Sequence, residues 1–439
     1  MSQPPKTIVH RMASVTGWLM LDRFVRIGIG FAVSILIARY YGPSEWGMLS
    51  YVLASATLFG SVATAGSEDI VLKDLVQAHS SQKQADIQKT AFILRLIFGA
   101  IAYIALVLLI GISQGIGMLF YMAAIYGILF IFQASEIWEY RLRIEQRISV
   151  ITKTHLSTCF ISSALKICCV LFHWPMVYVT ASMSGEYAAN MGILAAYRAR
   201  HWTKWAGGFD KVYAKKLLSS SLLVMTSGFL IACQVRCEYY LVDYFLGIES
   251  VGIYAAAFKS MELFEIMVVI FSMTLIPELS KRDFTDLPIL ASRTYLLGFL
   301  FFLAMLLPIA LIYFLFPWIY GKEYVDAQSL LPYLAFRPLL IILGSIRSMF
   351  LVLEGRLRYV PICAVVGVLS SLSLGCILIP IWGLTGAAIS GLTSLLISNF
   401  VMDIFFRRQN IVRMSQAFTQ WPYFLNKVLQ LVHLRKTLK

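Results

Sequence analysis

Apolar residues run in long unbroken blocks along this chain, and most charged residues lie in the gaps between the blocks. A mainly apolar window of about 20 residues predicts a membrane-spanning helix, because a helix of that length crosses the hydrocarbon core. Strands of a membrane barrel would alternate polar and apolar residues over about ten positions, and these blocks do not. The pattern predicts twelve spans, at residues 13–38, 45–66, 91–112, 115–138, 150–172, 174–197, 217–246, 251–279, 289–316, 327–353, 357–379 and 383–406.

Composition supports the same fold class. Hydrophobic residues make up 59% of the 439 residues and charged residues only 14%, whereas soluble domains have about 45–50% and about 25%. The bilayer must therefore be the solvent for most of the chain. Because helices satisfy their own backbone hydrogen bonds in lipid, we expect an all-α membrane protein with about 12 transmembrane helices.

The positions of Lys and Arg predict the orientation. Sorting all 37 of them places 28, Arg95 among them, in one set of loops and termini, and only Arg39 and Lys322 in the opposite set. Positive charge marks the cytoplasmic side, so both termini are expected in the cytoplasm. The net charge of +14 is then explained by loops that face anionic lipid, and no nucleic-acid partner is expected.

Two similar turns indicate an internal repeat. Gly42 and Gly47 enclose four residues after the first span, and Gly247 and Gly252 enclose four after the seventh. The offset of 205 residues predicts two halves of six spans each in parallel orientation. The expected domains are an N-terminal six-helix bundle (1–198), a basic cytoplasmic linker (199–216), a C-terminal six-helix bundle (217–406) and a basic tail (407–439). The tail has the spacing of an interfacial amphipathic helix.

Charged residues inside the predicted spans are the candidate functional residues. Each costs roughly 2.5–3.5 kcal/mol at the centre of the bilayer, so deep ones should face a polar cavity. Lys166 and Arg337 have no acidic residue within a helical turn, which favours a cavity with surplus positive charge and an anionic substrate. The cations expected to face it are Arg23, Arg26, Arg236, Lys259 and Arg337, with Asp22, Glu262 and Glu265 as candidate charge-pairing or ion-coupling residues.

The motifs of enzymes and motors are missing from the sequence. There is no Gly-x4-Gly-Lys-Ser/Thr phosphate loop and no His-Glu-x-x-His zinc motif, and the six histidines are scattered, which places them mostly in loops or near span ends. The seven cysteines lie in apolar runs and are expected to be buried hydrophobic residues rather than disulfides. We therefore expect no cofactor, no metal and no catalytic residue.

Four segments carry a resemblance to a known family. They are SILIARYYGPSEWG (34–47), GIYAAAFK (252–259) with Pro277 downstream, LFPWIYG (315–321) continuing through Ala327 and Leu331, and LIPIWGLTGAAI (378–389). The first resembles the ARxxGPxxxG turn and the last the PxxGxxGAA link of the Wzx-type polysaccharide (O-antigen) flippases. These flippases are part of the multidrug/oligosaccharidyl-lipid/polysaccharide exporter superfamily.

This resemblance implies two six-helix bundles, the N and C lobes, around a central cavity lined by the cations named above. The implied activity is translocation of an undecaprenyl-diphosphate-linked oligosaccharide from the cytoplasmic to the periplasmic leaflet of the bacterial inner membrane. Its implied partners are this lipid-linked substrate and membrane lipids, with a polymerase and chain-length machinery as further candidates. The implied pathways are those of lipopolysaccharide O-antigen or another surface polysaccharide.

Two other functions remain open from the sequence. A multidrug or cation antiporter of the same fold would use carboxylates inside the spans, and Asp22, Glu262 and Glu265 keep that alternative in play. A polysaccharide polymerase or ligase would need a large periplasmic loop, whereas the outer loops predicted here are short. An enzyme is therefore the least favoured of the three.

Overall fold

The computed structural model describes residues 5–78, 80–202, 207–279, 287–355 and 359–419, and all regular secondary structure in these ranges is helical. By its internal contacts the chain divides into two compact units, Met1–Gly252 (unit 1) and Ile253–Lys439 (unit 2). Among the described residues, eight helical stretches are long and apolar enough to cross a membrane. The predicted fold class, an all-α membrane protein, is confirmed.

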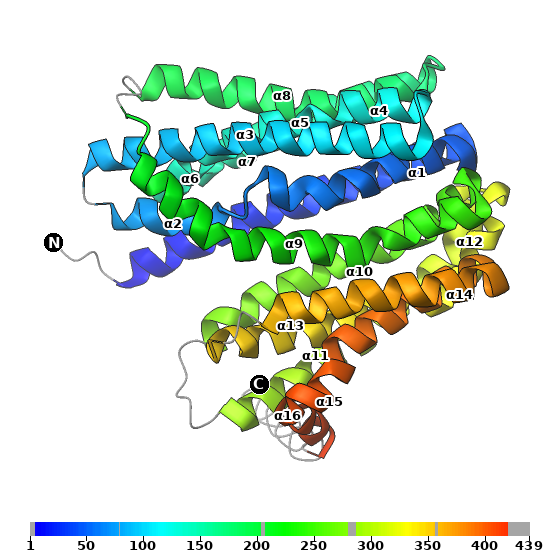
Figure 1. Ribbon diagram of the computed structural model, residues 1–439. Coiled ribbons are helices and arrows are strands. Elements are labelled where there is room, and N and C mark those ends of the chain that lie inside the picture. The colour runs from blue at the N-terminus through cyan, green and yellow to red at the C-terminus, as the bar shows by residue number, and fades with distance from the viewer. Residues whose placement is uncertain (1–4, 79, 203–206, 280–286, 356–358, 420–439) are drawn as a thin grey trace, which may run out of the picture. The chain divides into compact units, whose positions relative to one another are not determined.

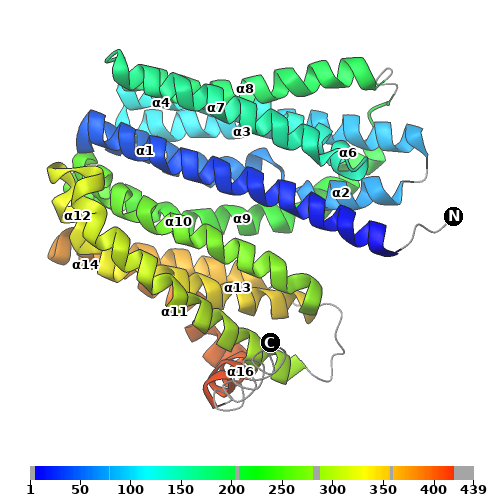
Figure 2. The same cartoon turned by 180° about the vertical axis from the view of Figure 1, so that it is seen from behind.

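Unit 1 is a bundle of long helices with shorter ones at its ends (Figures 1 and 2). Helix α1 packs against α3, α7 and α9, and α7 packs against α8. The elements are α1 (Pro5–Ala63), α2 (Glu68–Gln77), α3 (Ser81–Gln114), α4 (Met118–Gly127), α5 (Leu129–Phe132), the 3₁₀ helix η1 (Gln133–Ser135), α6 (Glu136–Ile144), α7 (Ile148–Leu171), α8 (Met176–His201) and α9 (Lys211–Leu246).

Unit 2 repeats this style of packing with α11 against α13 and α16, and α14 against α12 and α13. Helix α10 begins at the end of unit 1 and continues into unit 2. The elements are α10 (Ile248–Leu279), α11 (Leu287–Tyr320), η3 (Lys322–Tyr324), α12 (Val325–Leu334), α13 (Arg337–Leu353), α14 (Tyr359–Leu396), the π-helical turn η4 (Ile397–Val401), α15 (Met402–Phe406) and α16 (Arg408–Thr419). Most of the predicted tail helix, residues 420–439, lies outside the described residues.

The predicted spans fall on these helices. Helix α1 holds the first two spans and doubles back between them (Figure 1), because Gly42 has φ 76° and ψ 175°, which is not helical. The last two spans lie on α14, η4 and α15, with a break between them at Gly383. The span 115–138 is assembled from α4, α5, η1 and the start of α6, and the span 327–353 from α12 and α13.

Backbone conformation supports the predicted repeat. Every predicted outward-facing turn contains one residue with positive φ: Gly42, Gly115, His173, Gly247, Gly321 and Gly383. These positions pair between the halves at offsets of 205, 206 and 210 residues. The inner turns at Gln146 and Gly355 pair in the same way, at 209. Gly42, Gly115, Gly247 and Gly321 also combine positive φ with an extended ψ, a region that is essentially restricted to glycine.

The second glycines of the two predicted motifs pack against each other inside unit 1. A Cβ on Gly252 would collide with the carbonyl oxygen of Pro43, and one on Gly47 would collide with that of Ile248. The start of α10 therefore lies directly on the backbone of the Gly42 turn. Only residues without a side chain permit this approach.

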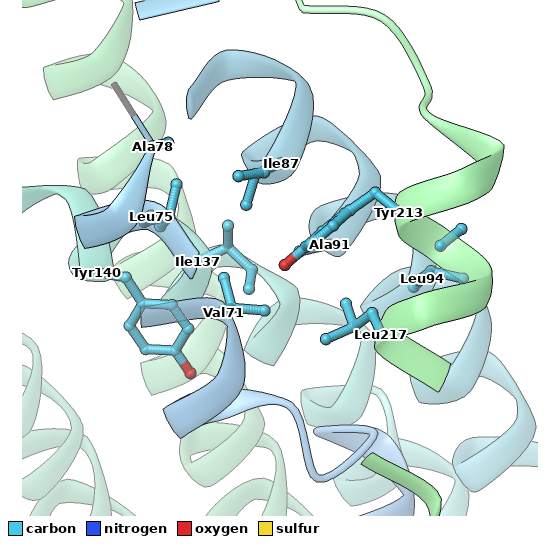
Figure 3. Packing of buried hydrophobic residues seen from close by; sticks show 11 residues of the cluster. Val71, Leu75, Ala78, Ile87, Ala91, Leu94, Ile137, Tyr140, Tyr213 and Leu217 are labelled. Carbon is cyan, nitrogen blue, oxygen red and sulfur yellow. The ribbon is translucent and has the colours of Figure 1, made fainter. Parts of the chain in front are cut away.

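A hydrophobic cluster closes one end of unit 1, where α2, α3, α6 and α9 meet (Figure 3). Val71 and Leu75 of α2 point toward Ile87 of α3 and Ile137 of α6, with Tyr213 entering from α9. This packing fixes the first turns of α9 to the short helices. The start of α9 is capped by the Asp210 side chain, which accepts hydrogen bonds from the N–H groups of Val212 and Tyr213.

Candidate functional site

The five cations predicted to line a cavity are distributed over both units. Arg23 and Arg26 lie on α1 and Arg236 on α9, in unit 1, whereas Lys259 lies on α10 and Arg337 on α13, in unit 2. The side chains of Arg23, Arg26 and Arg236 are half-buried. The convergence of these five side chains on one cavity stays a prediction. The side chain of Asp22 lies outside the described part of the structure.

In unit 2, both predicted cations are paired with the predicted acidic residues. The Lys259 Nζ lies 2.8 Å from the Glu262 Oε2, one helical turn away. The Arg337 Nε donates to the Glu265 Oε1, and its guanidinium lies 4.4 Å from the centre of the Phe258 ring. The Arg337 side chain is only 3% exposed. A long apolar helix thus carries two carboxylates, each held by one cation.

The expectation of surplus positive charge around Lys166 and Arg337 is wrong, because both have acidic partners. Arg337 and Lys166 were expected to lack acidic partners because none lies within a helical turn. Arg337 meets Glu265 from another helix, and the Lys166 Nζ on α7 lies 3.8 Å from the Glu186 Oε2 on α8. Neither residue therefore contributes an uncompensated charge.

Arg26 of α1 lies near α7 and α8. Its charge acts on Cys159 of α7 and on Tyr187 of α8, and its Nε is buried. Arg236 of α9 lies with its guanidinium 5.7 Å from the centre of the Tyr239 ring. Both arginines are thus half-buried near aromatic side chains.

Two buried arginine clusters were missed by the sequence analysis. Arg95, which the loop count placed in a cytoplasmic loop, is buried in α3 and donates to the Glu136 carboxylate at 2.8 Å and the Tyr140 hydroxyl at 2.6 Å. Arg347 of α13 forms a bidentate pair with Asp403 of α15, with both N···O distances 2.7 Å. Glu136 follows Arg95 by 41 residues and Asp403 follows Arg347 by 56, so local spacing could not reveal either pair.

The described residues contain no group of three or more His, Cys, Asp or Glu side chains that could hold a metal ion. Several ionisable side chains inside the helices are arranged as pairs of opposite charge. Such pairs keep ionisable groups tolerable inside a bundle, and ionisable residues at these depths usually mark substrate or ion pathways.

Comparison with known proteins assigns the family. Residues 13–282 match the model of the polysaccharide biosynthesis protein family. The chain belongs to this family. A search of curated proteins gave no match. The sequence resemblance is thus confirmed at the level of the superfamily that contains the Wzx-type flippases.

Solved structures show the same fold over nearly the whole chain. An inward-facing multidrug resistance transporter of the MATE family, in the MOP superfamily, matches with TM-score 0.66 at 14% identity, covering 93% of this chain and 99% of that one. The lipid II flippase MurJ in an inward closed conformation matches with TM-score 0.61 at 12% identity, covering 91% and 90%. The MATE multidrug transporter DinF-BH matches with TM-score 0.62 at 14% identity, covering 93% and 98%. The twelve-span, two-lobe layout fits this fold.

Proposed function

We propose that this protein is a flippase for an undecaprenyl-diphosphate-linked oligosaccharide, the repeat unit of O-antigen or of another surface polysaccharide. It would move this substrate from the cytoplasmic to the periplasmic leaflet of the bacterial inner membrane, as a transporter and not as an enzyme. The observation that carries the proposal is membership of a polysaccharide biosynthesis family on a fold that a lipid II flippase also adopts.

The physical problem is the head group. A sugar diphosphate is large, hydrated and dianionic, so it cannot cross hydrocarbon, whereas its polyprenyl chain can stay in lipid throughout. A bundle that shields the head group and opens alternately to each side solves this problem. Cations inside the bundle replace the hydration that the diphosphate loses when it leaves water, because they neutralise its charge and donate hydrogen bonds to its oxygens.

We assign head-group binding to Arg23, Arg26, Arg236, Lys259 and Arg337. The pairs Arg337–Glu265 and Lys259–Glu262 suit this role, because a carboxylate can neutralise the cation while no substrate is bound. The diphosphate would then replace the carboxylate. Glu262 and Glu265, with Asp22, are the proposed charge-pairing residues that are displaced.

A multidrug or cation antiporter is the second candidate, because two of the structural matches above are multidrug transporters. Such a protein would bind cationic compounds through its carboxylates. Its arginines would only neutralise those carboxylates while no compound is bound. The two functions therefore assign opposite roles to the same ion pairs.

The test separates these roles in a strain that lacks its own copy of the gene. Arg337→Gln should abolish surface-polysaccharide display, and Glu265→Gln should retain it, because a diphosphate needs the cation and not the carboxylate. Membrane abundance of each variant is measured in parallel, and Arg141→Gln, in an exposed pair with Glu145, serves as the matched control. Full display in Arg26→Ala, Arg236→Ala and Arg337→Ala would refute the assignment.

A further inference from the structure

A cavity of about 580 Å³ opens beside the first turns of α9, between this helix, α3 and the turn that follows α1. All of these elements belong to unit 1. The volume is within the range of small-ligand sites. This cavity is called the α9 pocket, and its walls are formed by Phe98, Lys215, Leu218, Ser219, Leu222 and Met225.

The α9 pocket lies on a side of α9 that the hydrophobic cluster does not use. Tyr213 and Leu217 enter that cluster from α9 (Figure 3). Lys215, Leu218 and Leu222 recur at intervals of three and four residues, which places them in a different stripe along the helix. Leu222 is 57% exposed. Because the bilayer surrounds the apolar part of this helix, the pocket is open to lipid chains.

A turn of unusual conformation closes the end of the pocket farthest from Lys215. Ala65 and Gly66 are consecutive residues with positive φ, at 51° and 55°. A Cβ on Gly66 would lie 2.7 Å from the Met225 nitrogen, so the turn rests on the backbone of α9. Ala65 is 3% exposed and lines the pocket. Such conformations persist only where the surrounding structure holds them, so the pocket has a fixed inner end.

The charge of the pocket is confined to its other end. Lys215 lies two residues before the predicted span 217–246, at the level expected for lipid head groups. Met225 is ten residues farther along α9, about 15 Å along the axis, which is half the thickness of the hydrocarbon core. The pocket therefore has a cation near the membrane surface and apolar walls inside, as a lipid of one leaflet would require.

The neighbouring charges leave Lys215 available to an anion. The Lys216 Nζ lies 3.3 Å from the Asp74 Oδ1, whereas Lys215 pairs with no carboxylate in the described part of the chain. Lys211, one turn earlier on the same side of α9, is exposed and adds a second cation. The Asp210 side chain is engaged in capping the helix. No acidic side chain is among the described residues that line the pocket.

We propose that the α9 pocket binds one anionic glycerophospholipid of the predicted cytoplasmic leaflet. Its phosphate would lie against Lys215, and one acyl chain would lie along Leu218, Leu222 and Phe98. Basic pockets between membrane helices on the cytoplasmic side favour anionic head groups. A zwitterionic lipid carries its own cation beside the phosphate and gains less from the lysine. The proposal does not depend on the proposed function, because this lipid is a resident ligand and not the transported one.

The test is native mass spectrometry of the purified, delipidated full-length protein with phosphatidylglycerol and with phosphatidylcholine of the same acyl chains. The native protein should bind one phosphatidylglycerol in preference to phosphatidylcholine. Lys215→Gln should weaken phosphatidylglycerol binding about fivefold, the usual contribution of one lysine near charged lipid, and leave phosphatidylcholine binding unchanged. Lys216→Gln is the matched control and should bind as the native protein does. Equal losses in Lys215→Gln and Lys216→Gln would overturn the proposal.

A second pair of variants tests the shape of the pocket. Ser219→Phe should weaken the binding of both lipids because the ring would fill the pocket. Ser220→Phe is the control, since Ser220 is also exposed on α9 but is not among the described lining residues. Equal binding by these two variants would contradict an acyl-chain site.

Thermal unfolding provides a measurement that does not rely on retention of the lipid in the gas phase. Phosphatidylglycerol should raise the unfolding temperature of the native protein and of Lys216→Gln, because a ligand stabilises the state that binds it. The rise should be smaller in Lys215→Gln. If a polyprenyl diphosphate bound the pocket and phosphatidylglycerol did not, the pocket would belong to the transported lipid and the proposal would be wrong.

Discussion

At the scale of single residues, several buried cations of this protein pair with an acidic residue on another helix. The partners of Arg95, Lys166, Arg337 and Arg347 each lie on a different helix from the cation. The positions of Lys166 and Arg337 inside spans were predicted from the sequence, because hydropathy shows which charges interrupt an apolar run. Their partners were not, because spacing along one helix reveals only neighbours three or four residues away.

The Arg347–Asp403 pair allows a direct measurement of what such a pair contributes. Both side chains are almost fully buried, at 4% and 1% exposure, so removing one partner leaves an uncompensated charge. We expect Asp403→Asn to lower the free energy of unfolding by about 3–5 kcal/mol, measured by thermal unfolding in detergent. The double variant Arg347→Met with Asp403→Leu should recover most of that loss.

The matched control is the exposed pair of Arg141 and Glu145, whose N···O distance of 2.9 Å is similar. Exposed pairs contribute about 0–1 kcal/mol, so Glu145→Gln should leave the unfolding temperature nearly unchanged. If Asp403→Asn lowered the unfolding temperature no more than Glu145→Gln does, burial would not account for the contribution of the Arg347–Asp403 pair to stability.

At the scale of the elements, most of the fold was predictable. Each predicted span lies mainly on helix because a run of about 20 apolar residues leaves few alternatives in lipid. Hydropathy could not show that one span is built from several short helices. The span 115–138 consists of α4, α5, η1 and the start of α6. The residues at the breaks are as apolar as the helices, so hydropathy does not reveal the breaks. The short helix α2, a cap on the end of unit 1, was not predicted either, because it is too polar for a span.

The turns provide the prediction at this scale. Gly252→Ala should destabilise the protein by about 1–3 kcal/mol, the usual cost of forcing an atom into a close-packed contact, because its Cβ would meet the Pro43 carbonyl. Thermal unfolding in detergent gives the comparison. Gly60→Ala is the control, since nothing lies within 4 Å of a Cβ at Gly60 and alanine favours helix there. Equal stability of the two variants would mean that the two turns do not interlock.

At the scale of the whole molecule, orientation and domain division rest on charge and on the repeat. Arg95 was counted among the loop residues although it lies in α3. Moving this one residue into a span hardly changes the excess of Lys and Arg in the loops of one side over the other. The division at 198 and 217 stays a prediction, as do the cytoplasmic termini. The positive-φ turns, with offsets of 205 to 210 residues between the halves, support two equivalent halves of six spans.

Orientation can be checked with single cysteines in a background without the seven native ones. Lys322→Cys and Glu249→Cys should react with a membrane-impermeant maleimide in intact cells whose outer membrane has been permeabilised. Lys83→Cys and Arg200→Cys should react only after lysis. All four positions are exposed or partly exposed, so access depends on the side of the membrane. Labelling of Lys322→Cys only after lysis would reverse the topology.

The most direct test of the central claim is transbilayer movement of the lipid itself. Vesicles containing the purified protein are loaded with a fluorescent polyprenyl-diphosphate oligosaccharide, and a membrane-impermeant quencher reports the fraction in the outer leaflet. We predict that the protected fraction becomes accessible with the native protein, and that it stays protected with Arg337→Gln and in protein-free vesicles. The contrary result is a protected fraction that never moves, while the same vesicles transport a cationic dye. That outcome would identify a drug transporter and contradict the flippase assignment.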